Sequence, residues 1–146
     1  DGVHVDPVAV QMALQCKGPD RVSLITDAMV GAGLPPGRHV FGGQDVIFPE
    51  PGAPARLVGT PTRKGGGLVG SGLTLNLAVR NAVRMIGVSL PQAVRMASAN
   101  PAQVLGLAGS KGRILPGYDA DLVIFDESYD VQQTWVGGNT VFKKEI

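Results

Sequence analysis

The run RVSLIT at residues 21–26 is short, largely apolar and rich in β-branched side chains, and Asp27 follows it directly. A run of this kind is typical of a strand that is buried on both faces of a parallel sheet. Parallel barrel strands end at a common mouth, where catalytic groups gather. The run therefore predicts a barrel strand with a candidate catalytic carboxylate at Asp27. The alternative is an aspartate that caps a turn or the next helix.

The segment before this run predicts the rest of a β-α-β unit. Residues 7–17 fit a helix with Asp6 as its N-cap and a proline at its first position. If Val3 and His4 end the strand before this helix, the crossover brings His4 and Asp27 to one mouth. A lone histidine is otherwise more often a partly buried polar group than a catalyst.

The rest of the chain alternates between strand and helix patterns. Residues 28–37 indicate a loop over a site, and short strands at residues 39–41, 45–48 and 56–58 predict a peripheral meander. A glycine-rich loop at residues 65–72 precedes a long amphipathic helix at residues 73–86, and further helices begin near Ser89 and Asn100. Strands are predicted at residues 120–125, 131–136 and 140–142.

The glycine-rich loop contains Gly70, Ser71 and Gly72 immediately before a helix start. Backbone N–H groups in such a loop could hold an anion or a sugar hydroxyl. It is not a phosphate-binding loop of the Gly-Lys-Ser/Thr type. A flexible loop with a helix cap fits the same spacing.

Composition limits the possible functions. A chain of 146 residues is too short for a complete eight-stranded barrel. Its net charge of +1, with scattered Lys and Arg, favours no nucleic-acid partner, and no apolar run reaches membrane-spanning length. Cys16 is the single cysteine, so no internal disulfide can form, and we expect it to pack as a small apolar residue. We expect a cytoplasmic protein. Because the sequence begins without Met, we also expect a piece of a longer chain.

The residue types do not support two common kinds of catalytic site. The only histidines are His4 and His39, and the second lies in the predicted meander, whereas a catalytic zinc site needs about three protein ligands. Ser71 lacks the nucleophile elbow of a Ser-His-Asp hydrolase. We therefore expect no metal site and no serine nucleophile in this chain.

Several stretches of the chain together resemble the N-acetylglucosamine-6-phosphate deacetylases of the amidohydrolase superfamily. In the family's order they are DGVHV at residues 1–5, LITDAM at 24–29 with GAG at 31–33, LVGSGLT at 68–74, NPA at 100–102 and KGRILPGYDADLV at 111–123. The last stretch is shared widely across amidohydrolases. The first two together are closer to a deacetylase.

The resemblance implies an α/β fold, namely the C-terminal fragment of a TIM-type (β/α)8 metal-dependent hydrolase barrel plus part of a small β-sandwich. It divides the chain into the last barrel strands, helix and active-site loop (1–37), a β-rich meander (38–64), a Gly-rich loop with C-terminal barrel helices (65–108), and β-sandwich strands (109–146). The family's metal-binding Glu and two His lie upstream. A divalent metal, Zn or Fe, would thus belong to the full-length enzyme and not to this fragment.

The resemblance also implies roles for individual residues. Asp27 would be the general base that takes a proton from a metal-bound water and then the acid that protonates the amine. His4 would hydrogen-bond the acetamide oxygen. Further positions match those that line the sugar: Asp1, Gly2, Val3, His4, Leu68, Val69 and Gly70. Phosphate-binding residues would lie mostly elsewhere and in the partner subunit of a homodimer.

The function implied for the parent enzyme is hydrolysis of N-acetylglucosamine 6-phosphate to glucosamine 6-phosphate and acetate, with the fragment alone inactive. One alternative keeps the fold and changes the substrate to another N-acetylated sugar or a cyclic amide. Another is a non-catalytic β/α module that self-associates or binds a partner through an open sheet edge.

Overall fold

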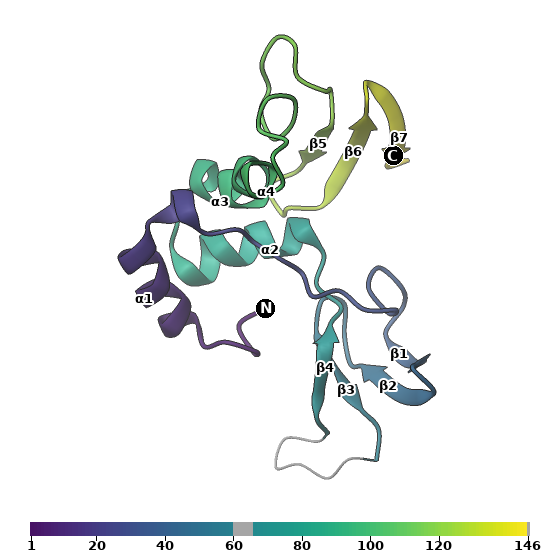
Figure 1. Cartoon of the computed structure of the whole chain (residues 1–146). Helices are drawn as coiled ribbons and strands as arrows, with labels where there is room; N and C mark the ends of the chain where they lie inside the picture. Colours follow the sequence, from purple (N-terminus) through teal and green to yellow (C-terminus); the bar gives the residue numbers. More distant parts are fainter. Residues whose placement is uncertain (60–65, 146) are drawn as a thin grey trace.

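The structure is a computed structural model that describes residues 1–59 and 66–145. Within these residues, two separate antiparallel sheets lie beside a layer of helices, one above the other in the view of Figure 1. The N-terminus lies beside the helical layer, and the C-terminus leaves from the far sheet. The elements in chain order are α1 (Pro7–Lys17), a short 3-10 turn η1 (Pro19–Arg21), β1 (Gly37–Phe41), β2 (Gln44–Phe48), β3 (Pro54–Leu57), β4 (Leu68–Ser71), α2 (Leu75–Asn81), a π-helical turn η2 (Ala82–Ile86), α3 (Leu90–Ala97), α4 (Ala99–Val104), β5 (Leu122–Phe125), β6 (Val131–Val136) and β7 (Asn139–Lys143).

The first sheet is a meander in the order β1-β2-β3-β4, with antiparallel pairs throughout. Gly42 and Gly43 join β1 to β2 with φ angles of 57° and 77°, a two-residue turn that favours glycine at both positions. The buried core of this sheet is formed by Val46, Phe48 and Ala55. The predicted meander at residues 39–58 is thereby confirmed.

The meander also gains a strand that the sequence predicts as loop. The predicted glycine-rich loop begins at residue 65, which lies outside the described residues, and its residues 68–71 form β4. This strand pairs with β3 through Pro54 opposite Ser71 and Arg56 opposite Leu68. The prediction of loop was wrong here because pairing with a neighbouring strand outweighs the low strand preference of glycine.

The helical layer follows the predicted capping signals closely. Asp6 caps α1, since its Oδ1 accepts the Val8 N–H at 2.9 Å. Ser89 and Gln92 form a capping box at the start of α3. The predicted helix at residues 73–86 begins at Leu75 and widens into the π-helical turn η2. The core of the layer contains Val79, Ala82, Ala93 and Tyr129.

The second sheet has the order β5-β6-β7, and its members are the three C-terminal strands that the sequence predicts. Lys111, in the loop before β5, lies with its Nζ 2.5 Å from Asp121 and 2.9 Å from Asp119. Asp121 also accepts the Gly137 N–H at 2.8 Å, which ties this loop to the β6–β7 turn. The Lys111 ammonium and the Gly137 N–H lower the pKa of Asp121, and the two carboxylates raise the pKa of Lys111.

The predicted mixed α/β class is confirmed, but the described residues form two antiparallel sheets and no barrel. Arg21 ends the turn η1 and residues 22–26 form no strand ladder, while Val3 and His4 lie in a turn rather than at the end of a strand. The parallel pairing in this region is a single bridge between Ala28 and Ser71. A buried parallel strand is stabilised by neighbours on both edges, and the described part of the chain supplies none for residues 21–26.

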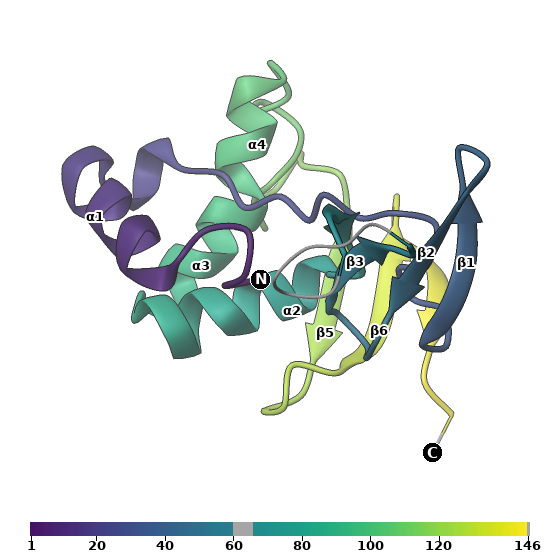
Figure 2. The same cartoon turned by 90° about the horizontal axis from the view of Figure 1, so that it is seen from below.

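Two further observations concern the surface of the molecule. Cys16 is exposed, so the prediction that it packs as an apolar residue was wrong; Leu14 is the one buried residue in α1. No helix in the described ranges is long and apolar enough to cross a membrane. Figure 2 shows α1 at the edge of the helical layer, where one side of the helix is open to solvent.

Candidate active site

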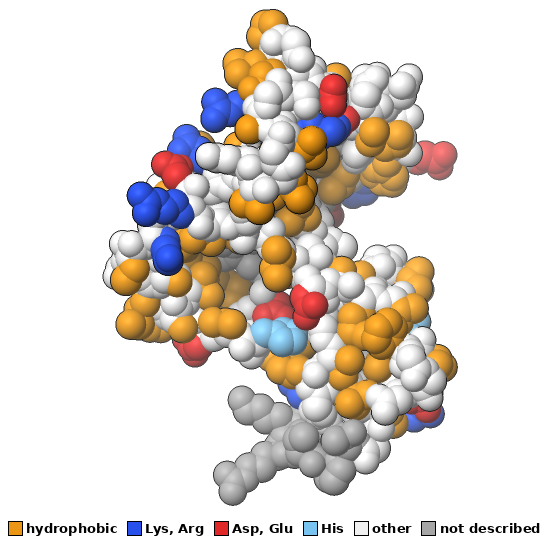
Figure 3. All heavy atoms as spheres, in the orientation of Figure 1, with side chains coloured by type: hydrophobic (Ala, Val, Ile, Leu, Met, Phe, Trp, Pro, Cys, Tyr) orange, Lys and Arg blue, Asp and Glu red, His pale blue; other side chains and the backbone are white. Residues whose placement is uncertain are grey.

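A cavity of about 360 Å³ lies between the N-terminal turn, the extended run at residues 22–27 and the helices of the central layer. His4 and Asp27 both line it, although they come from segments on either side of α1. Its walls are mostly apolar, with Leu24, Met85 and Met96 among them. In Figure 3, histidine and acidic side chains lie together between the helical layer and the meander. The structure thus brings the two predicted catalytic residues to one cavity without the two strands that the sequence predicts.

The N-terminal turn is folded around the carboxylate of Asp1. Its Oδ1 accepts the N–H groups of Val3 and His4 at 3.0 and 3.1 Å, and its Oδ2 lies 2.5 Å from His4 Nδ1. The Asp1 side chain is 8% exposed and the His4 side chain 32%. No described residue bonds to Nε2 of His4. The turn therefore fixes the imidazole through Nδ1 and leaves Nε2 available to a ligand.

Asp27 differs from Asp1 because its side chain has no bonding partner among residues 1–59 and 66–145. The residue is exposed and lines the cavity. Its φ is +50°, a left-handed conformation that costs free energy for a residue with a Cβ. An unbonded carboxylate on a strained backbone is the arrangement expected where a side chain is held ready for chemistry.

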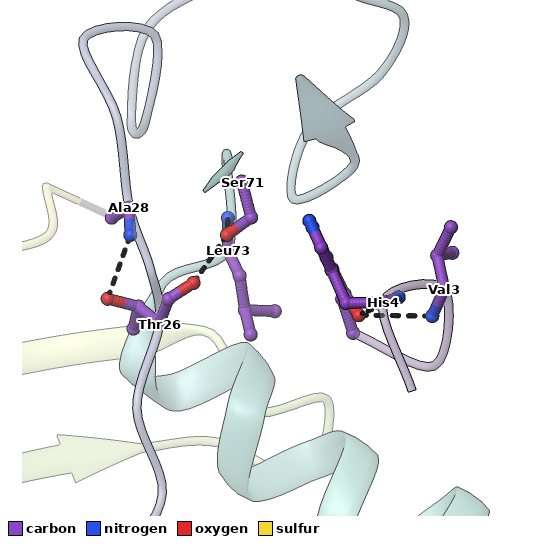
Figure 4. A network of polar contacts seen from close by, with 7 residues as sticks. Val3, His4, Thr26, Ala28, Ser71 and Leu73 are labelled. Atoms are coloured by element: carbon purple, nitrogen blue, oxygen red, sulfur yellow. Dashed lines mark hydrogen bonds and ion pairs between the residues drawn. The ribbon is translucent and has the colours of Figure 1, made fainter. Parts of the chain in front are cut away.

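Ser71 organises the backbone around Asp27. Its hydroxyl donates to the Thr26 carbonyl oxygen at 2.5 Å and accepts the Leu73 N–H at 3.0 Å. Its own N–H donates to the Asp27 carbonyl oxygen, and its carbonyl oxygen accepts the Met29 N–H, both at 2.8 Å. Figure 4 shows two hydrogen-bonded groups. One contains Thr26, Ala28, Ser71 and Leu73, and the other is the turn at Val3 and His4. The backbone N–H groups of Ser71 and Gly72, which the sequence suggested for an anion or a sugar hydroxyl, therefore donate to carbonyl oxygens of the chain itself.

Gly70 permits this close approach of β4 to Asp27. Its φ is +67°, and a Cβ at this position would lie 2.6 Å from Cγ of Met29 and 2.9 Å from the Asp27 carbonyl oxygen. Only glycine fits such a position without displacing a neighbour. The predicted substrate-binding residue Gly70 thus contacts the backbone of the candidate catalytic residue.

The predicted sugar-lining positions divide into two groups. Asp1, Gly2 and His4 line the cavity. Val3, Leu68, Val69 and Gly70 do not; Val3 and Leu68 are 49% and 41% exposed. The role of Ser71 has no signal in the sequence, because its bond to Thr26 spans 45 positions in the chain. A serine that is 1% exposed inside a glycine-rich strand is the observation that identifies it.

The residues of the described ranges do not fit a metal centre. No group of three or more His, Cys, Asp or Glu in them could hold a metal ion. His39, the other histidine, lies in β1, where its Nε2 is 3.3 Å from the Pro35 carbonyl oxygen and its ring packs edge-on against Phe48. The arrangement at the cavity supplies a carboxylate and an imidazole, which suits proton transfer and hydrogen bonding to a polarised carbonyl.

These features describe a mixed α/β chain with a carboxylate and an imidazole in one cavity, and comparison with known proteins gives its family. Residues 20–141 match the Amidohydrolase family. The chain belongs to that family.

Its relatives are deacetylases of amino-sugar phosphates. The N-acetylgalactosamine-6-phosphate deacetylase of Escherichia coli O157:H7 is 40% identical over 138 residues, which cover 94% of this chain and 34% of that protein. The N-acetylglucosamine-6-phosphate deacetylase of Lysinibacillus sphaericus is 42% identical over 138 residues, covering 94% and 33%. The chain spans about a third of the length of these relatives, whereas it covers 77% of a shorter relative from Escherichia coli K12 at 40% identity.

Solved structures give the same relationship. The N-acetylglucosamine-6-phosphate deacetylase of Thermotoga maritima has a TM-score of 0.80 and 33% identity, over 99% of this chain and 37% of that chain. A mutant of the Mycobacterium smegmatis enzyme, in complex with N-acetyl-D-glucosamine-6-phosphate, has a TM-score of 0.80 and 36% identity, over 96% and 35%. The described fold therefore corresponds to part of these enzymes.

Proposed function

We propose that this chain is the C-terminal part of an enzyme that hydrolyses N-acetylglucosamine 6-phosphate to glucosamine 6-phosphate and acetate. The observation that carries the proposal is the unbonded carboxylate of Asp27 in the same cavity as His4. Sequence identity also supports the proposal. Over 94% of its length, this chain is 40% identical to an N-acetylgalactosamine-6-phosphate deacetylase and 42% identical to an N-acetylglucosamine-6-phosphate deacetylase.

Asp27 is the general base and then the general acid of the proposed reaction. Its carboxylate takes a proton from the water that adds to the acetamide carbon, and it passes that proton to the departing nitrogen as the C–N bond breaks. An amine is a poor leaving group unless it is protonated, so one group that does both steps suits the chemistry. The absence of a hydrogen-bond partner within the described residues supports this role, because no existing bond must break first.

His4 holds the acetamide oxygen in the proposed reaction. Asp1 accepts the Nδ1–H, so Nε2 of His4 can donate only when both ring nitrogens carry a proton. A fixed donor stabilises the negative charge that develops on the oxygen more in a dry, apolar cavity than in water. The residues Asp1, Gly2 and His4 form the sugar-binding edge of the cavity, and we assign Val3, Leu68, Val69 and Gly70 to the same edge in the parent enzyme.

The parent enzyme would supply what the described residues lack. A divalent metal, when bound, would polarise the carbonyl and activate water, and its ligands would lie outside these residues. We propose that residues 1–27 join the end of a barrel in the parent enzyme. Residues 21–26 have the apolar pattern of a parallel strand and lack only neighbouring strands. The isolated 146-residue chain is accordingly expected to be inactive.

A substrate panel tests the proposal. The full-length parent is assayed for acetate release from N-acetylglucosamine 6-phosphate, N-acetylgalactosamine 6-phosphate and unphosphorylated N-acetylglucosamine, with a cyclic amide as the competing substrate class. We expect the first sugar to give the highest kcat/KM. A higher kcat/KM for N-acetylgalactosamine 6-phosphate would change the proposed substrate but not the proposed reaction. Turnover of the cyclic amide alone, or of none of the four, would refute deacetylation, and turnover by the isolated chain would refute its inactivity.

A further inference from the structure

Ser71 is fully buried, and its hydrogen bonds are made to the backbone of neighbouring segments. The residue is 1% exposed and does not line the cavity that holds His4 and Asp27. Three of its four hydrogen bonds go to the backbone on either side of Asp27, namely to the Thr26 carbonyl, the Asp27 carbonyl and the Met29 N–H. In the fourth hydrogen bond, the hydroxyl accepts the N–H of Leu73, which itself lines the cavity. Ser71 therefore affects a ligand through other residues, and mainly through the segment that carries Asp27.

These bonds fix the two peptide planes that determine the direction of the Asp27 side chain. The Thr26 carbonyl belongs to the plane before Cα of Asp27, and the hydroxyl of Ser71 holds it at 2.5 Å. The Asp27 carbonyl belongs to the plane after it, and the backbone N–H of Ser71 holds that one at 2.8 Å. With both planes held, φ stays at +50° and the Cα–Cβ bond has one direction.

We propose that Ser71 is a positioning residue for the Asp27 carboxylate, a role that rests on the proposed function of Asp27. Without the hydroxyl, the peptide plane before Asp27 loses its side-chain anchor and the residue can relax from its strained conformation. The carboxylate then samples directions away from the substrate. A misplacement of about 1 Å can lower a rate by roughly a hundredfold.

Asn100 offers a matched control at the other end of the same segment. It is 7% exposed, and its Nδ2 donates to the carbonyl oxygens of Pro19 and Val22 at 2.7 and 2.6 Å. Asn100→Ala also removes buried hydrogen bonds to this segment, but it leaves both peptide planes at Asp27 in place. A purely structural role for Ser71 predicts similar consequences for the two variants.

The experiment compares Ser71→Ala, Ser71→Thr and Asn100→Ala in the full-length parent. We expect Ser71→Ala to lower kcat for N-acetylglucosamine 6-phosphate roughly tenfold to a hundredfold with little change in KM, and Ser71→Thr, which keeps the hydroxyl, to recover most of it. Asn100→Ala is expected to lower Tm while kcat of the folded enzyme is maintained. Equal losses of kcat in Ser71→Ala and Asn100→Ala would overturn the proposal. If Ser71→Ala does not fold, Ser71→Cys replaces it in the comparison. Its thiol has a similar size but is a weak donor, so the same loss of kcat is expected.

Two further measurements separate this proposal from the proposed function. If Ser71 acts through Asp27, Ser71→Ala lowers kcat much less in an Asp27→Asn background than in the wild type, whereas independent roles give additive losses. A crystal structure of the Ser71 variant is expected to show residue 27 away from its positive φ, and an unchanged φ would overturn the proposal. An inactive parent would refute only the proposed function. The crystal structure would still test whether Ser71 fixes the backbone of Asp27, because that measurement does not need turnover.

Discussion

Two regions of the molecule hold aspartates in opposite ways. Near the second sheet, Asp121 binds the Lys111 ammonium and the Gly137 N–H, so both of its oxygens serve the fold. In the cavity, the Asp27 carboxylate is unbonded within the described residues, and its backbone is held by Ser71 instead. A carboxylate thus stays available for chemistry when the anchoring hydrogen bonds are made by its main chain.

The largest expected effect is on turnover. Asp27→Asn in the full-length parent should lower kcat by about 10²–10⁴-fold, because a carboxamide cannot accept and return a proton. The matched Asp121→Asn, which changes another exposed aspartate in the other region, should leave kcat near the wild-type value. Steady-state kinetics and metal content of the purified variants measure both effects. Wild-type turnover in Asp27→Asn, or a comparable loss in Asp121→Asn, would remove the functional difference between the regions.

The next effect is on stability and tests how closely β4 must approach Asp27. Gly70→Ala adds a Cβ that meets Met29 and the Asp27 carbonyl oxygen at a positive φ, and should lower the free energy of unfolding by about 2–4 kcal/mol. Gly43→Ala is the control, since its φ is +77° but nothing lies within 4 Å. It should lose about 1 kcal/mol from backbone strain alone. Urea unfolding of the chain measures both values, and equal losses would contradict the close contact.

The smallest effect is the pH dependence of the exposed Lys111–Asp121 pair. The pKa of Asp121 is lowered from 3.8 in the folded state, so its stabilisation is present above pH 3.8 and is lost as the pH falls through the lower, folded value. The pKa of Lys111 is raised from 10.5, so its stabilisation is present below that pH and is lost only at higher pH.

The measurement is the difference in Tm between wild type and Asp121→Asn across this range. It should be constant near neutral pH, shrink in acid below pH 3.8, and decrease with added salt because the pair is exposed. A Tm difference that persists unchanged in acid would show that the carboxylate charge does not stabilise this region.

The elements that the sequence predicts well are those whose signals are local. Asp6 and the following proline define the start of α1, Ser89 and Gln92 define the start of α3, and paired glycines define one turn in each sheet. Each signal involves residues within a few positions of one another, so no tertiary information is needed.

The elements that it predicts poorly depend on distant partners. Residues 21–26 have the composition of a strand, but a parallel strand exists only beside its neighbours. His4 and Asp27 do share a cavity, though for a different reason than the two predicted strands. The role of Ser71 could not be predicted either, because the carbonyl that it binds is far away in the chain and no local pattern records that bond.

The parallel bridge between Ala28 and Ser71 has a consequence for how this family can vary. The chain departs from the cavity at Ala28 and returns to it at Ser71, and the two points are pinned together. The meander between them is thus a segment whose two ends meet at one point. We therefore expect a changed length of the turn between β1 and β2 to leave the cavity intact, provided that Gly70 and Ser71 persist.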